Sequence, residues 1–167
     1  RGIGPLLEAL DVLSVLRCEG DAPRDLREKS LHLAARILEM TGAVANTGGY
    51  GAAQRALDSG AAHEKFGKIV FAQGAREIPP PARFRKVVLE QHSGGRVQEV
   101  DCWEIARVAK RAGAPANVSA GVKMLKSVGE QVTSGEPLFE IHAASAAQLE
   151  SASSYARSVR RLIRYEA

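Results

Sequence analysis

Cysteines, aromatic residues and long apolar runs are all scarce in this sequence, and each scarcity argues against a class of protein. Its 167 residues include two cysteines, Cys18 and Cys102, which lie far apart and share no metal-binding spacing. We therefore expect no disulfide framework and no zinc site, and a reduced, cytoplasmic protein is the default. No segment approaches the roughly 20 apolar residues that a membrane span needs.

The positive charge of the chain does not by itself indicate a nucleic-acid partner. The net charge is +4, but the cations are dispersed apart from four arginines between residues 157 and 164. Aromatic residues make up 5% of the chain, too few to stack bases between those cations. We expect neither a nucleic acid nor a membrane among the partners.

Apolar residues recur at three- and four-residue spacing through the first 74 positions. This periodicity predicts helices over residues 5–17, 24–40, 52–58 and 62–73. In the last of these, Phe66, Ile69 and Val70 are the predicted buried positions. No strand is predicted in this part, so it is expected to form a helical layer that lies on another layer.

A proline-rich segment follows these helices and marks a domain boundary. Residues 78–82 contain three consecutive prolines, a composition typical of stiff, extended linkers. The predicted organisation is a helical segment over residues 1–77, a linker over 78–82 and a second domain over 83–167. Because strands are predicted only after the linker, the fold class is α+β.

Strands and helices are mixed after the linker. Strands over residues 84–91 and 96–100 are predicted to form a hairpin through Ser93-Gly94-Gly95. A helix begins at Asp101 with Glu104 as its capping-box partner and Trp103 among its apolar positions. Another helix begins at Ser145 with Gln148 in the capping box, and residues 162–165 are predicted to form a closing strand.

The best-patterned β segment runs from Gly121 to His142. Apolar and polar residues alternate there, which predicts strands at 122–124, 132 and 138–142. Gly129 and Gly135 lie where the chain must reverse with a positive φ. The segment contains no acid–base pair, so it predicts a small curled β unit and no active site.

Two glycine-rich segments precede helices and are candidate anion sites. Gly48-Gly49-Tyr50-Gly51 could bind an anion with the first amides of a helix. No strand precedes it and no Lys-Ser/Thr pair follows it, so it lacks the context of a phosphate loop. A flexible connection between helices is the favoured interpretation, and Gly2-Ile3-Gly4 is an equally weak match.

The remaining residue types with chemical potential show no productive spacing. The histidines are His32, His63, His92 and His142, and no two have a metal-ligand spacing such as i, i+4. Ser151, Ser153 and Ser154 have no neighbouring base to activate them. We therefore predict no catalytic, substrate-binding, cofactor or metal residue in this chain.

The β segment 121–143 resembles a biotinyl or lipoyl half-barrel in its glycine and valine spacing. Carrier domains of that kind then bear a modifiable lysine in an Ala-Met-Lys-Met sequence. This chain has Ala144-Ser145-Ala146-Ala147 instead, and Lys123 lies within a strand pattern. A carrier function through Lys123 or Lys126 is therefore disfavoured.

Several stretches in order resemble the C-terminal part of thymidine phosphorylases, in the pyrimidine-nucleoside phosphorylase family. The resemblance is strongest to the long branch that includes the AMP phosphorylases. The matching stretches are Arg1-Gly-Ile-Gly-Pro-Leu-Leu-Glu-Ala-Leu-Asp-Val-Leu13, Asp25-Leu-Arg-Glu-Lys-Ser-Leu31, Leu57-Asp-Ser-Gly-Ala-Ala-His-Glu-Lys-Phe66, Ala72-Gln-Gly74, Ile105-Ala-Arg-Val-Ala-Lys-Arg-Ala-Gly-Ala-Pro115 and Gly121–Ala143 with the residues after it. Their joint order and spacing make the resemblance specific.

The resemblance implies an architecture and a reaction. It implies that residues 1–77 are helices of a large α/β domain and that 83–167 form an α/β hammerhead with a barrel-sandwich-like β unit. The implied reaction is the reversible phosphorolysis of thymidine to thymine and 2-deoxyribose 1-phosphate, with phosphate as co-substrate and no cofactor. A homo-oligomer is expected.

The same resemblance implies that this chain carries none of the catalytic groups. The family's phosphate- and base-binding residues precede the segment that resembles Arg1–Pro5, so no role is carried over to any residue here. We expect an inactive C-terminal fragment of an active enzyme. The alternative is a non-catalytic hammerhead or half-barrel module that binds a partner.

Overall fold

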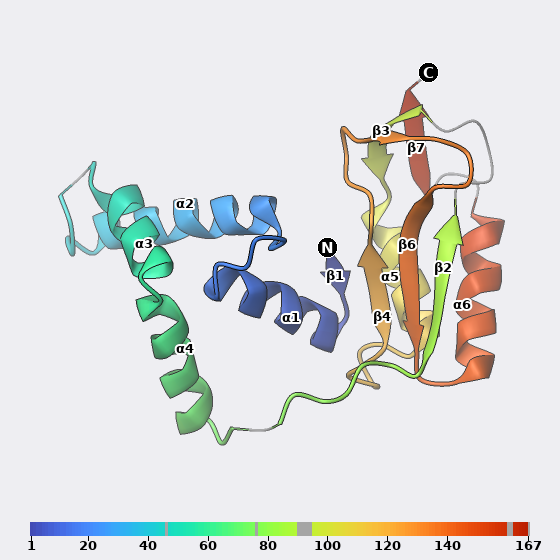
Figure 1. Ribbon diagram of the computed structural model, residues 1–167, viewed down its shortest axis with the longest axis horizontal. Helices are drawn as coiled ribbons and strands as arrows, with labels where there is room; N and C mark the ends of the chain where they lie inside the picture. The colour runs from blue at the N-terminus through green and yellow to red at the C-terminus, as the bar shows by residue number, and fades with distance from the viewer. Residues whose placement is uncertain (46, 76, 90–94, 160–161, 167) are drawn as a thin grey trace. The chain divides into compact units, whose positions relative to one another are not determined.

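The structure is a computed structural model that describes residues 1–45, 47–75, 77–89, 95–159 and 162–166. It is an α+β fold with helices and two antiparallel sheets (Figure 1). Its elements in order are β1 (Gly2–Ile3), α1 (Pro5–Leu16), α2 (Arg24–Met40), α3 (Gly49–Asp58), α4 (Ala61–Ala72), β2 (Phe84–Leu89), β3 (Gly95–Val100), α5 (Cys102–Ala112), β4 (Gly121–Met124), β5 (Gln131–Val132), β6 (Pro137–Ala143), α6 (Ala146–Ser158) and β7 (Ile163–Glu166).

The chain divides into two compact units. The C-terminal unit consists of residues 1–9 and 78–167, and the helical unit consists of residues 10–77. The first strand, β1, belongs to the C-terminal unit because it pairs with β4, Gly2 opposite Lys123 and Ile3 opposite Val122. The prediction of no strand among the first 74 residues is therefore wrong. A strand of two residues is too short to show the alternation of apolar and polar residues from which strands are predicted.

The C-terminal unit is built on a sheet with the strand order β1-β4-β6-β2. One face of this sheet is apolar and packs against α5 and α6 (Figure 1). Phe139 and Ile141 of β6 and Val122 of β4 lie fully buried on that face, as does Val108 of α5. Their alternation along β6 follows the two-residue period of a strand, so the core forms where the sequence pattern predicted it.

The predicted hairpin between residues 84–91 and 96–100 is wrong as a strand pairing. The strand β2 pairs with β6, whereas β3 lies in a second sheet of order β5-β3-β7. Alternation predicted both strands correctly but says nothing about which strands pair. The predicted turn residues Ser93 and Gly94 lie outside the described residues.

Two consecutive turns shape the β segment from Gly121 to His142. Both have the sequence Ser/Thr-x-Gly-Glu, at Ser127–Glu130 and Thr133–Glu136, and each places its glycine at a positive φ, 91° and 83°. The glutamate carboxylates accept hydrogen bonds from the Ser127 and Thr133 amides at 2.5 and 2.8 Å. The predicted turns are thus confirmed, and a short repeat closes both of them.

The helix α5 begins at an aspartate cap. The Asp101 carboxylate accepts hydrogen bonds from the Trp103 and Glu104 amides at 3.0 Å, as expected for an N-cap. Glu104 does not complete the capping box, because its carboxylate accepts from Arg107 and from the Tyr155 hydroxyl. Trp103, predicted among the apolar positions, is exposed, while Ile105 and Val108 are buried.

The helical unit contains a small core. Val15, Leu31, Ala53 and Leu57 are its buried residues, with partly buried neighbours around them. The helix α2 has the predicted bounds, but α3 begins three residues before its predicted start. None of the described residues of α4 is buried, so the predicted burial of Phe66, Ile69 and Val70 is wrong within the described chain.

Candidate functional site

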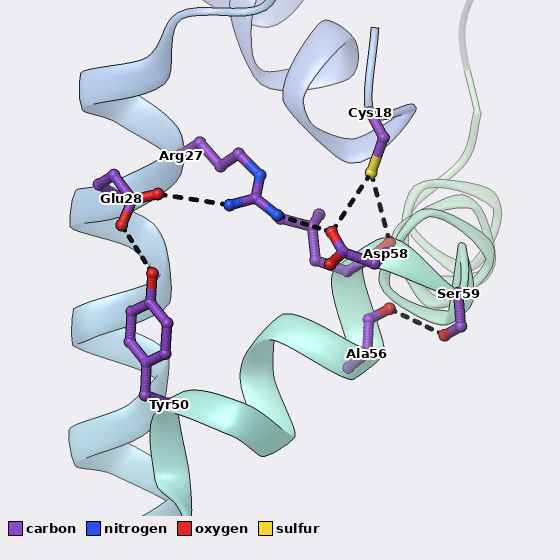
Figure 2. A network of polar contacts seen from close by, with 8 residues as sticks. Cys18, Arg27, Glu28, Tyr50, Ala56, Asp58 and Ser59 are labelled. Atoms are coloured by element: carbon purple, nitrogen blue, oxygen red, sulfur yellow. Dashed lines mark hydrogen bonds and ion pairs between the residues drawn. The ribbon is translucent and has the colours of Figure 1, made fainter.

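The polar residues of the helical unit meet in a network at the ends of its helices (Figure 2). The Arg27 guanidinium donates to Asp58 Oδ1 at 2.6 Å, and its other terminal nitrogen lies 3.4 Å from Glu28 Oε1. The Tyr50 hydroxyl donates to Glu28 Oε2 at 2.6 Å, and Cys18 Sγ lies 3.9 Å from Asp58 Oδ1. The network therefore joins α2 to α3 and to the turn after α1.

Hydrogen bonding within this network sets its charge states. The bond to Asp58 raises the pKa of Arg27, and the bond to Glu28 raises the pKa of Tyr50. Arg27 therefore stays charged, and Tyr50 keeps the proton that it donates. These groups pair opposite charges between α2 and α3, so the network stabilises the packing of the two helices.

The glycine-rich segment Gly48–Gly51, a candidate anion site from the sequence, lies at the first turn of α3. The Gly49 amide donates to the Glu39 carboxylate of α2 at 3.2 Å. A Cβ at Gly49 would lie 2.4 Å from the Ala35 carbonyl oxygen. The segment from Gly49 is thus helical and not a loop: a carboxylate of α2 accepts from its Gly49 amide, and Gly49 permits close packing of α3 on α2.

Three of the histidines lie within the described residues, and they are in different surroundings. His32 is exposed, with its ring centroid 5.1 Å from that of Tyr50, and His63 is half-buried on α4. Among the described residues no three histidine, cysteine or acidic side chains gather closely enough to hold a metal ion. His92 lies outside those residues.

One histidine, His142, is nearly fully buried and differs from the others for that reason. It is 5% exposed and lies on the sheet face opposite the α5–α6 core, between Gly121 of β4 and Arg85 of β2. Its Nε2 lies 3.2 Å from Glu140 Oε2, within ion-pair distance. Neither ring nitrogen has a hydrogen bond of good geometry to a described residue.

The charges around His142 come from three neighbouring strands. Glu140 lies opposite Lys123 of β4, and its other oxygen lies 3.9 Å from Arg85 Nη1. Burial lowers the pKa of His142, and the Glu140 carboxylate opposes that shift only in part. His142 is therefore neutral at pH 7. Period-two alternation along β6 could have placed Glu140 and His142 on one face, but not beside Arg85, because sequence does not reveal strand order.

The serines of α6 lack the partners that nucleophilic catalysis needs. Ser153 is buried and its Oγ has no hydrogen-bond partner among the described residues. Ser154 is exposed and donates to the Glu150 carboxylate at 2.9 Å, and Ser151 is also exposed. No described histidine activates any of them, so this part of the chain offers no serine nucleophile.

The lysines considered for a carrier function are placed differently from a modifiable tip lysine. Lys123 lies within β4, paired on both sides by β1 and β6. Lys126 donates to the Gln131 carbonyl and the Glu136 carboxylate, each at 3.3 Å. Both positions are held by pairing or hydrogen bonds, which argues against a carrier.

Comparison with known proteins connects these strands to a family. Residues 96–162 match the pyrimidine nucleoside phosphorylase C-terminal domain. The chain is 49% identical over 156 residues to a "Putative thymidine phosphorylase" of Ralstonia nicotianae. Residues 96–162 therefore belong to the C-terminal domain of the pyrimidine nucleoside phosphorylase family, and the chain is similar to proteins named thymidine phosphorylase. The resemblance carried by the ordered motifs from Arg1 to Ala143 is thereby confirmed.

Two further relatives extend the match within this phosphorylase family. The chain is 47% identical over 156 residues to "Putative thymidine phosphorylase 1" of Cupriavidus necator. It is 42% identical over 153 residues to a "Bifunctional ribose 1,5-bisphosphokinase-thymidine phosphorylase" of Cupriavidus pinatubonensis. The matches to the three relatives cover 93%, 93% and 91% of this chain, in the order given. It spans 31%, 30% and 25% of the relatives' own lengths.

No described helix is long and apolar enough to cross a membrane.

Proposed function

We propose that this chain is the C-terminal part of a thymidine phosphorylase, a pentosyltransferase. The whole protein would catalyse the reversible phosphorolysis of thymidine to thymine and 2-deoxyribose 1-phosphate, with phosphate as co-substrate and no cofactor. The observation that carries the proposal is 49% identity across 93% of this chain to a relative of that name. We further propose that the whole protein acts in the cytoplasm as a homo-oligomer.

Within that protein, residues 1–167 would support the active site without supplying its catalytic groups. Phosphorolysis needs cations and free amides around the phosphate, and polar groups that hold the leaving base. In the described residues the Gly49 amide donates to Glu39, and the cations Arg27 and Arg85 face carboxylates. These pairings support a scaffold: a helical segment of the parent's α/β domain over 10–77, a linker over 78–82 and a hammerhead domain over 83–167, to whose sheet β1 adds a strand.

Thymine release from thymidine and phosphate tests both parts of the proposal. The isolated chain is compared with a chimera, the Ralstonia relative whose matched third is replaced by this chain. We expect turnover by the chimera and none by the isolated chain. Turnover by the isolated chain would refute the scaffold role, and a folded chimera that acts only on nucleoside monophosphates would refute thymidine as the substrate.

A further inference from the structure

The buried histidine His142 lies on the face of the β1-β4-β6-β2 sheet that is opposite α5 and α6. Its neighbours across the strands are Gly121 of β4 and Arg85 of β2. Gly121 has no side chain that could cover the imidazole, yet His142 is only 5% exposed. The cover on the β4 side of the ring must therefore come from another segment of the chain.

That segment is the end of β1 with the first turn of α1. Because side chains alternate along a strand and Val122 is buried on the helix-covered face, a Cβ at Gly121 would point to the face of His142. Such a Cβ would lie 2.1 Å from the Ile3 carbonyl oxygen and 3.0 Å from Leu7 Cδ1. The chain from Ile3 to Leu7 therefore crosses the sheet directly over the strand position beside His142.

The covering segment, residues 1–9, is attached to the sheet through a short edge strand. The strand β1 is two residues long and lies at the edge of its sheet. Beside it, the Leu6 amide donates to the Val118 carbonyl at 3.0 Å, and the Met124 amide donates to the Arg1 carbonyl at 2.9 Å. Short edge elements of this kind open at a lower free energy than the core of a domain. The helix α1 continues from this attachment into the helical unit.

The surroundings of the ring resist its protonation while the segment covers it. The charged groups on the elements around it are Glu140 of β6, Arg85 of β2 and Lys123 of β4, and Glu8 of α1 accepts from the Gly4 amide. Burial lowers the pKa of His142, Glu140 opposes this shift only in part, and Arg85 and Lys123 add to it. Glu140 Oε2 lies 3.2 Å from Nε2, but neither ring nitrogen has a hydrogen bond of good geometry to a described residue. Protonation is therefore easier once the ring is in water.

We propose that His142 makes the attachment of residues 1–9 to the C-terminal sheet sensitive to pH. At neutral pH the uncharged imidazole lies under the covering segment, and β1 stays paired with β4. Acid favours the form in which this segment has separated from the sheet and the imidazolium is hydrated beside Glu140. Because the segment leads into α1, acidification loosens the start of that helix before the sheet core unfolds. The inference is independent of the proposed phosphorolysis.

Hydrogen exchange of single amides, measured by NMR on the 167-residue chain, tests this proposal. The Leu6 and Met124 amides report on the attachment, and the Val97 amide, which donates to the Glu130 carbonyl at 2.9 Å, reports on the core. Exchange rates are converted to opening constants, which removes the intrinsic pH dependence of exchange. Since a hydrated histidine titrates near pH 6.5, we expect opening at Leu6 and Met124 to increase by up to about tenfold between pH 7.5 and pH 5.5. It should also be at least about tenfold more frequent than opening at Val97 at both pH values. Opening that is unchanged by pH, or equal at all three amides, would overturn the proposal.

Two substitutions identify the cause of the acid effect. His142→Gln removes the titrating group and should abolish the increase at Leu6 and Met124. Leu7→Ala uncovers the ring in the folded chain, so it should raise opening at pH 7.5 and reduce the acid effect at least about twofold. Leu57→Ala is the matched control, because Leu57 is 6% exposed and Leu7 is 7% exposed, but Leu57 lies in the helical unit. An acid effect that persists in His142→Gln would refute the proposal. If that variant does not fold, equal effects of Leu7→Ala and Leu57→Ala would refute it instead.

Discussion

The two units of this chain bury their apolar residues to very different extents. In the C-terminal unit, Phe139, Ile141 and Val122 are fully buried between a sheet and two helices. In the helical unit, Leu31 of α2 and Leu57 of α3 are buried, but Leu33 and Ile37 on the other side of α2 are exposed. Apolar residues occur on both sides of α2, so the pattern alone does not reveal which side of the helix has a partner.

This difference predicts that the C-terminal unit holds most of the stability of the isolated chain. The C-terminal unit buries one face of a sheet under two helices, whereas the core of the helical unit consists of Val15, Leu31, Ala53 and Leu57. Comparable substitutions in the two units should therefore change the stability of the chain by different amounts. The following predictions are arranged from the largest expected effect to the smallest.

Truncating the centre of the sheet core should have the largest effect. Phe139→Ala removes a fully buried ring from β6 and should destabilise the C-terminal unit by about 3–5 kcal/mol. Phe71→Ala on α4, where the ring is exposed, should change stability by no more than about 0.5 kcal/mol. Denaturant unfolding measures both, and equal losses at the two positions would show that the units do not differ as described.

Filling the contact between α2 and α3 should destabilise the helical unit. The added methyl group of Gly49→Ala would lie 2.4 Å from the Ala35 carbonyl oxygen, so the helices must separate at a cost of roughly 1–3 kcal/mol. Gly67→Ala on α4 meets nothing within 4 Å and should instead stabilise its helix by about 0.5–1 kcal/mol. Amide hydrogen exchange within residues 24–72 separates these opposite effects; exchange that slows in Gly49→Ala would contradict them.

Acidification should weaken the C-terminal unit through His142. Burial holds the pKa of His142 below its ordinary 6.5, so the unfolded chain binds a proton that the folded chain resists. Stability should fall as the pH drops below about 7, by up to about 1.4 kcal/mol per pH unit, until the lower folded pKa is reached. The groups facing His142 are Glu140, Arg85 and Lys123.

The substitution His142→Gln should flatten this dependence. Unfolding free energies between pH 7 and pH 5 would then fall less steeply than in the unsubstituted chain. His32→Gln is the control, because His32 is exposed on α2. A slope left unchanged by His142→Gln, or flattened equally by His32→Gln, would remove His142 as its cause.

Removing a buried hydroxyl should have the smallest effect and the opposite sign. The Ser153 Oγ is buried without a hydrogen-bond partner among the described residues. Ser153→Ala removes that unsatisfied group and should be neutral or stabilise the chain by about 1 kcal/mol. Ser154→Ala loses the exposed bond to Glu150 and should not stabilise. A clear loss of thermal stability in Ser153→Ala would indicate a partner for its hydroxyl.

Local signals in the sequence predicted local structure well. The bounds of α2, the turns at Gly129 and Gly135 and the caps at Asp101 and Ser145 all depend on residues a few positions apart. The Thr-Ser-Gly-Glu turn also shows how such a signal works, because glycine provides the positive φ and glutamate binds the amide three residues back.

Contacts between distant segments could not be predicted in this way. The failed hairpin between β2 and β3, the unexpected strand β1 and the helical start at Gly49 each depend on a partner more than a few residues away. The cluster of Glu140 and His142 with Arg85 needed the strand order as well. Exposure of Trp103 and Ile69 shows the same limit, since an apolar residue is buried only if something packs on it.

The pairing of β1 with β4 has a consequence for how the chain folds. Residue 2 must meet residue 123 before the first sheet can complete its edge, and such non-local pairing slows folding because the intervening chain loses entropy when its ends meet. During synthesis, β1 is made long before β4. Its backbone can therefore pair with β4 only after the residues of α2 and α3 have also been made. The helical unit is therefore a long insertion between β1 and the rest of its sheet, and the loop that contains it must close before β1 can pair.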